Sequence, residues 1–195
     1  MNNKTFKFVN SLYVIMITNI LAIIYLALGL FSFTLVPVIF TVIKVMKELI
    51  DEEIDGYSGI IKYFTSKFLI NFKKYKREEM LTGIYTLILI IAIFLLKRVN
   101  IPYATSINML FMYIYAMISV YWSYYALRNL DGDNDYSYIK TVILMFKNIK
   151  SLLMTVCIFI ALILGGIAMK EILALFSLSL FGFLFVKLNY KAVVN

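Results

Sequence analysis

The chain has 195 residues, of which 63% are hydrophobic, and carries a formal net charge of +8 at pH 7. A soluble globular domain is about 45–50% apolar, so a water-soluble fold of this length is excluded. The backbone has no water to bond in lipid, and the apolar stretches are continuous. The sequence therefore predicts an all-α fold, a polytopic transmembrane helix bundle that forms one domain over residues 1–195.

Six apolar stretches approach the length of about 20 residues that a membrane span needs. In chain order, the expected spans cover residues 8–31, 33–49, 80–96, 101–127, 151–169 and 172–188. The first is about twice as long as a signal-peptide apolar region and lacks a cleavage pattern, so we expect it to stay in the mature protein.

The second stretch is the weakest of the six, because Lys44 interrupts it. A re-entrant or interfacial helix is the alternative to a full crossing. A crossing is favoured, because without it the basic segment that follows would lie outside while the N-terminus stayed inside. Lys44 could then extend its ammonium group to the membrane surface.

Positive charge predicts the orientation of the spans. With a cytoplasmic N-terminus, all but three of the 19 Lys and Arg residues fall on the cytoplasmic side, and the three outside are Lys97, Arg98 and Lys170. A cytoplasmic excess of Lys and Arg is the established orientation signal. We therefore expect both chain ends in the cytoplasm, together with residues 50–79 and 128–150.

Each cytoplasmic segment contains a predicted amphipathic helix at the membrane interface. The apolar stripe of the first comprises Ile61, Phe64, Phe68, Phe72 and Tyr75, and that of the second comprises Ile139, Val142, Phe146 and Ile149. The candidate contacts with anionic lipid headgroups are Lys62, Lys67, Lys73, Lys74, Lys76, Lys140, Lys147 and Lys150. Such helices usually anchor a protein, and specific ligand binding is the alternative.

The two segments also raise the possibility of a parallel internal repeat. Phe72-Lys73 and Phe146-Lys147 match, and Met80 matches Met154 at the same offset. Each unit would consist of an interfacial helix and an out-and-back pair of spans, as in some transporters. The alternative is a chance likeness, because Lys-rich helices that precede apolar spans match easily.

Residues for catalysis are largely missing from the sequence. There is no histidine, and the one cysteine, Cys157, lies in the fifth expected span. There is also no phosphate-binding glycine loop. Glu78 and Glu79 are interpreted as solvated charges at a helix end. We expect no enzyme activity, no metal, no cofactor and no nucleic-acid partner.

Polar groups inside the spans are better candidates for function, because lipid makes them costly. Asn19, Asn108 and Tyr113 are the candidate residues of a polar path through the bundle. The simpler interpretation is that the asparagines bond neighbouring helices, each contact contributing about 0.6–2 kcal/mol.

The chain resembles the YesL family of bacterial integral membrane proteins. The likeness rests on residues 30–44, which include Pro37, on the charged segment 51–56, on Tyr63-Phe64 and on residues 71–73. Residues 121–129 and 145–148 repeat parts of it. The resemblance implies a bacterial plasma-membrane protein with a role near sugar uptake and identifies no functional residue.

Two functions follow as hypotheses. The first is a permease-like or accessory component linked to carbohydrate uptake, with sugar-transporter subunits as partners and a polar path through the bundle. The second is a membrane assembly or interaction protein that transports nothing, with a dry bundle and basic helices docked on a partner or on lipid.

Overall fold

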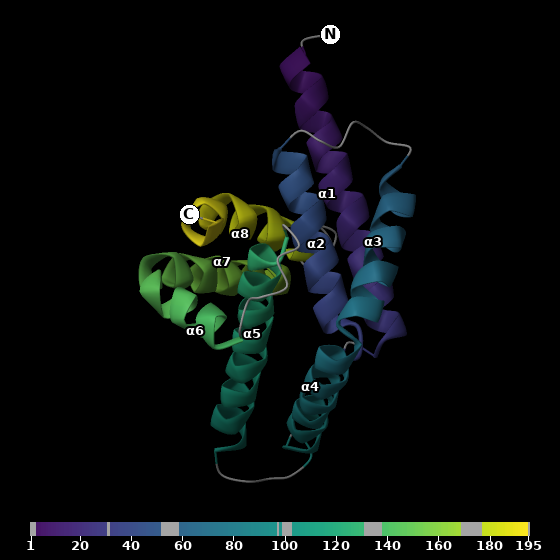
Figure 1. Cartoon of the computed structure of the whole chain (residues 1–195). Helices are drawn as coiled ribbons and strands as arrows, with labels where there is room; N and C mark the ends of the chain where they lie inside the picture. The colour runs from purple at the N-terminus through teal and green to yellow at the C-terminus, as the bar shows by residue number, and fades with distance from the viewer. Residues whose placement is uncertain are drawn as a thin grey trace.

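The computed structural model describes residues 3–30, 32–51, 59–96, 98, 103–130, 138–168 and 177–194, and the regular elements in these ranges are all helices (Figure 1). In chain order they are α1 (Asn3–Leu28), α2 (Leu35–Ile50), α3 (Ile60–Lys74), α4 (Lys76–Leu96), α5 (Ala104–Arg128), α6 (Tyr138–Lys147), α7 (Ile149–Ala168) and α8 (Ser177–Val194). The all-α prediction is confirmed for these residues.

Three helices in the described ranges are long and apolar enough to cross a membrane, namely α1 over Thr5–Leu28, α4 and α5. The number rises to four if α6 and the first part of α7, which meet at 90°, form one broken span. α2 has 16 residues and is shorter than a full span of about 20. The chain therefore has the helices of a membrane protein, and six crossings remain a prediction.

The helix that sequence analysis rated as the weakest span forms the centre of the molecule. α2 packs against α1, α3, α4, α5 and α8. Most of its residues are buried, and Val36, Val45 and Met46 are fully covered. Its strong amphipathic pattern arises because Lys44, Lys47 and Glu48 share the less buried face, while the apolar residues face other helices.

The other helices surround α2 in two groups. α1, α2 and α3 lie alongside one another, and the hairpin of α4 and α5 extends beyond them (Figure 1). α6, α7 and α8 lie on the side of α5, with α7 and α8 running across the direction of α5 (Figure 1). The C-terminal half of α5 joins the two groups, because its residues from Val120 to Leu127 are almost all buried.

The basic helix α3 turns part of its expected stripe toward the bundle. Phe64 and Phe68 are buried, and so is Tyr75, which ends the helix. Ile61 and Phe72 are exposed. Burial raises the pKa of the Tyr75 hydroxyl above its ordinary value.

The basic helix α6 presents the opposite face to the bundle. Thr141 and Met145 are its buried residues. The expected stripe, Ile139, Val142, Phe146 and Ile149, is exposed. An exposed apolar stripe on a helix that meets its successor at 90° suits contact with lipid.

Candidate functional site

Asn19 of the expected polar path is fully buried and holds the beginning of α8. Its side-chain oxygen accepts hydrogen bonds from the backbone N–H groups of Leu178 at 2.9 Å and Ser179 at 3.2 Å. The first N–H groups of a helix have no partner within the helix, so they need an acceptor from elsewhere. Asn19 therefore acts as a helix cap supplied by another helix.

The other two residues of the expected path do not join Asn19. Asn108 is partly buried, and its side-chain oxygen has no hydrogen-bond partner among the described residues. Tyr113 is 56% exposed and lines a groove between α4 and α5. Neither that groove nor the interior cavity between α1, α2, α5 and α8 has Asn19 or Asn108 in its lining.

A second helix cap comes from Glu79, whose side chain is 3% exposed. One carboxylate oxygen accepts the N–H of Val36 at 2.9 Å, and the other is buried without a hydrogen-bond partner among the described residues. Pro37 has no N–H, and Val38 donates to the carbonyl of Thr34. The N–H groups of Val36 and Val38 in the first turn of α2 are thereby paired. Because Glu79 is buried, its interpretation as a solvated charge is wrong.

The turn between α1 and α2 rests on the beginning of α4. The ring of Phe33 lies against Gly83, where a Cβ atom would meet a ring carbon at 2.6 Å. Only glycine permits this approach without a shift of the ring. Together with Glu79, this contact holds the first two turns of α4 against the beginning of α2.

A buried network of polar side chains connects α5, α7 and α8. The side-chain oxygen of Asn189 accepts hydrogen bonds from Tyr124 at 2.6 Å and Ser151 at 2.5 Å. Its amide nitrogen donates to Thr155 at 3.2 Å and to the carbonyl of Phe185 at 3.0 Å. This cluster satisfies its own polar groups and leaves the asparagine no free donor or acceptor for a solute.

The groove between α4 and α5 has a volume of about 480 Å³ and is larger than the interior cavity between α1, α2, α5 and α8. Its lining is largely apolar and aromatic and consists of Leu81, Thr82, Tyr85, Tyr113, Ile114, Met117, Ile118, Tyr121 and Trp122. At one end it continues into a smaller cavity of about 280 Å³, where Arg77, Glu78 and Tyr138 join the lining. A groove with an aromatic body and one polar end suits an amphiphilic molecule.

The candidate headgroup lysines are largely exposed. The exposed ones are Lys62, Lys73, Lys74, Lys76, Lys140, Lys147 and Lys150. Lys67 is partly covered, and its ammonium nitrogen lies 5.1 Å from the centre of the Tyr63 ring. The helices α3 and α6 lie on different sides of the molecule (Figure 1).

Sequence reasoning missed Glu79, Asn189 and Arg77 as residues of interest. The clue for Glu79 was Pro37, because a helix that begins with proline at a buried end still needs an acceptor for the two N–H groups before it. Asn189 lies just past the expected end of the sixth span, so it was not among the polar residues expected inside the membrane.

Comparisons with protein-family models, with curated proteins and with solved structures find no match to this chain. The resemblance to the YesL family therefore stays a prediction.

Proposed function

We propose that this protein is a membrane-embedded accessory or assembly component that does not itself conduct a solute. The observation that carries this proposal is the position of Asn19, whose side-chain oxygen accepts two hydrogen bonds from the backbone of α8. The Asn189 cluster is likewise closed on itself. Polar groups that bond neighbouring helices support a packed bundle better than a solute path.

The exposed lysines supply the surface through which such a protein would act. The exposed lysines of α3 lie on a helix that packs on α1, α2 and α4 and leaves its other face open. That face suits anionic lipid headgroups or an acidic partner surface. Because the chain resembles the YesL family, the partners proposed here are subunits of a sugar transporter.

The proposed setting is a bacterial plasma membrane with both chain ends in the cytoplasm. The charge distribution supports this orientation. The finer topology, with six crossings, two interfacial helices and a parallel repeat, belongs to the same proposal. The bounds of α3–α4–α5 and of α6–α7–α8 support the repeat, because each unit has a short basic helix, a long apolar helix and a third helix in that order.

Affinity capture from native membranes tests the proposed role. The protein, tagged and solubilised in mild detergent, should recover transporter subunits reproducibly. A variant with Lys62, Lys73 and Lys74 changed to Gln should recover less, and one with Lys140, Lys147 and Lys150 changed to Gln serves as the matched set on the other side. Recovery of the protein alone would refute the partnership.

A permease-like role is the second candidate, and the oxygen of Asn108 favours it. This oxygen is buried and unpaired in the part of the chain that the structure describes, and unpaired polar groups in a membrane often mark a solute path. Liposomes that contain the purified protein should show no uptake of labelled sugar if the accessory role is right. Uptake that Asn108→Leu abolishes would establish the permease role instead.

A further inference from the structure

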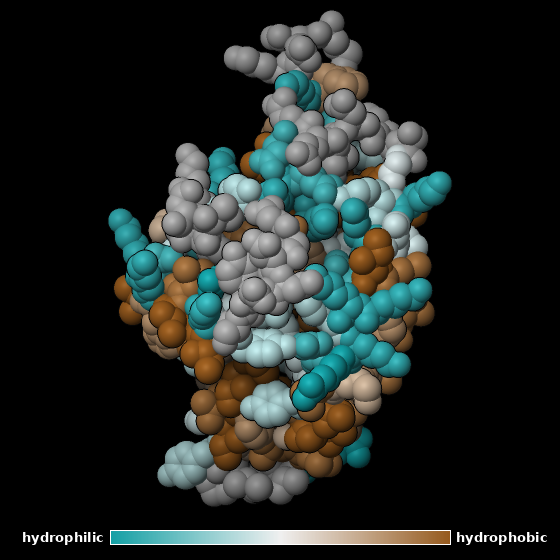
Figure 2. Space-filling view, viewed as in Figure 1, coloured by the Kyte–Doolittle hydropathy of each residue, from teal (hydrophilic) through white to brown (hydrophobic). Residues whose placement is uncertain are grey.

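The groove between α4 and α5 combines two environments along its length. Its body is formed by aromatic and aliphatic side chains from facing turns of the two helices, among them Tyr85, Tyr113 and Met117. Leu81, Thr82, Tyr121 and Trp122 line both this body and the polar end, so the two cavities form one continuous groove. The space-filling view shows the hydrophobic surface over this hairpin, with hydrophilic residues bordering it toward the beginning of α4 (Figure 2).

The polar end is built where α4 begins and α6 begins. The hydroxyl of Tyr138 donates to a carboxylate oxygen of Glu78 at 2.7 Å, and its ring stacks on Tyr125 with centroids 5.2 Å apart. The hydrogen bond occupies one oxygen of the Glu78 carboxylate. Arg77 is exposed and forms no ion pair or hydrogen bond with residues in the described ranges. The groove therefore ends at an available guanidinium group.

The charge around this end is positive on balance, because Arg77, Lys74 and Lys76 together outweigh the carboxylate of Glu78. Lys74 and Lys76 are exposed on either side of Tyr75, and Glu79 faces inward to cap α2. The hydroxyl groups of Thr82 and Tyr121 lie in the lining shared with the polar end and can donate hydrogen bonds. Arginine is well suited to phosphate, because its planar group donates two parallel hydrogen bonds.

We propose that this groove is a binding site for one anionic phospholipid, with its phosphate at Arg77 and an acyl chain along the aromatic body. α4 is largely exposed, and the N-terminal half of α5 is exposed or partly exposed, so lipid has direct access to the groove there. The polar end lies at the beginning of α4, the end that charge places at the cytoplasmic surface, where anionic lipids gather.

The position of Trp122 provides a direct test, because it is the only tryptophan in the chain and lines the groove. The full chain is reconstituted into vesicles that contain brominated phosphatidylglycerol or brominated phosphatidylcholine at equal mole fraction. Bromine quenches tryptophan fluorescence on contact. We expect about fivefold preferential quenching by phosphatidylglycerol, the preference that one basic residue confers near an anionic lipid.

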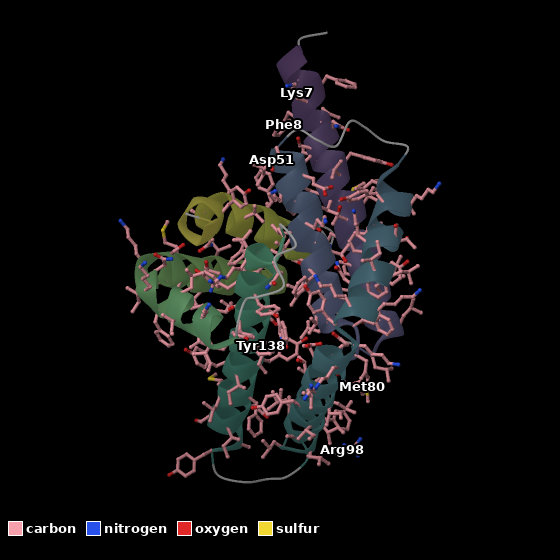
Figure 3. All side chains as sticks on the ribbon, in the orientation of Figure 1. Lys7, Phe8, Asp51, Met80, Arg98 and Tyr138 are labelled. Atoms are coloured by element: carbon pink, nitrogen blue, oxygen red, sulfur yellow. The ribbon has the colours of Figure 1, made fainter. Side chains whose placement is uncertain are left out.

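Two pairs of variants separate the site from general lipid contact. Arg77→Gln should remove the preference, whereas Arg98→Gln should keep it, because Arg98 lies at the far end of the hairpin from Tyr138 (Figure 3). Thr82→Phe should reduce quenching by both lipids by filling the groove, whereas Thr105→Phe, on an exposed part of α5, should not. Circular dichroism checks that each variant keeps its helices.

Equal quenching by the two lipids in the unmodified protein would overturn the proposal and identify only surrounding bulk lipid. Glycerol 3-phosphate should not displace the brominated lipid, and displacement would assign the site to a free phosphate compound instead. This test uses no partner protein, so its failure would leave the accessory role untouched.

Discussion

At the residue scale, two helix beginnings inside the bundle depend on side chains from other helices. Glu79 of α4 serves α2, and Asn19 of α1 serves α8. Buried N–H groups without an acceptor each cost about 1–3 kcal/mol, and Thr34, which precedes α2, makes no side-chain cap bond of its own. The polar residues of this bundle therefore hold its helices at fixed positions.

Removal of the Glu79 carboxylate should be strongly destabilising. Glu79→Ala leaves the N–H group of Val36 buried without an acceptor, so we expect a loss of about 1–3 kcal/mol in the free energy of unfolding. Glu79→Gln keeps one oxygen acceptor and should lose about half as much or less. Unfolding in SDS, followed by circular dichroism, measures the difference. Lys76→Ala, an exposed side chain in the same turn of α4, should change stability by about 0.5 kcal/mol or less.

The Asn189 network should show coupling between its members. Asn189→Leu and Tyr124→Phe remove the two ends of one 2.6 Å hydrogen bond. Each change alone should destabilise by about 0.6–2 kcal/mol, and the pair should fall short of the sum by at least about 0.5 kcal/mol. A double-mutant cycle in the same unfolding assay measures this. Tyr113→Phe, an exposed tyrosine on α5, is the neutral control, and strict additivity would contradict the network.

Of these residue roles, the sequence predicted that of Asn19 but not that of Glu79. The cost of polar groups in lipid correctly identified Asn19 as a residue that bonds another helix, which was the favoured interpretation. It did not identify Glu79 as buried, because the N–H group that it bonds lies 43 residues away in the sequence. Charge next to a span boundary suggests exposure, and only the packing of α4 on α2 shows that this carboxylate faces inward.

At the element scale, the position of α2 explains its sequence. A helix that crosses lipid alone needs about 20 apolar residues, whereas one enclosed by protein can be shorter and can carry a lysine near its end. α2 has 16 residues and is covered by five other helices. It packs tightly on α8 at Gly182, where a Cβ atom would meet a methyl carbon of Val42 at 2.7 Å.

Enlargement of Gly182 should separate α8 from α2. Gly182→Ala introduces that overlap and should cost about 1–3 kcal/mol. Addition of Val42→Ala removes the methyl carbon that is met and should restore part of the loss. Gly59→Ala is the matched control, because nothing lies within 4 Å of its added methyl group. The stability of each variant is measured by unfolding in SDS. Equal stability of Gly182→Ala, of its combination with Val42→Ala and of Gly59→Ala would contradict this packing.

Hydropathy predicted the existence of the helices well, because every expected span contains a helix in the described ranges. It could not predict their contacts. The exposed apolar stripe of α6 has the same spacing as a stripe that faces protein, since lipid and a protein core favour the same residues. The expected match between α3 and α6 is also incomplete, because α6 meets α7 at 90° while α3 and α4 follow one another along the same side (Figure 1).

At the scale of the whole molecule, the hairpin of α4 and α5 provides the clearest test of orientation. Charge predicts that its connection lies outside and that α3 lies inside. Two exposed serines report on these two places, Ser66 on α3 and Ser106 near the beginning of α5. Both are far from the polar network of Asn189 in sequence, so substitution should leave that network intact.

Cysteine labelling in intact cells should distinguish the two sides. In a Cys157→Ser background, a membrane-impermeant maleimide should label Ser106→Cys and leave Ser66→Cys unlabelled. After permeabilisation, Ser66→Cys should react as well. The reverse pattern would overturn the proposed orientation, and equal labelling of both in intact cells would show that α4 does not cross.

The cap of α2 also bears on the order of biosynthesis. The ribosome adds Val36 well before Glu79, so a nascent chain contains α2 for some time without the carboxylate that completes its first turn. During that interval the short helix has neither its acceptor nor most of its neighbours. We therefore expect α1 to enter the translocon first, and α2 to reach its final depth only when the beginning of α4 has emerged and can dock beside it.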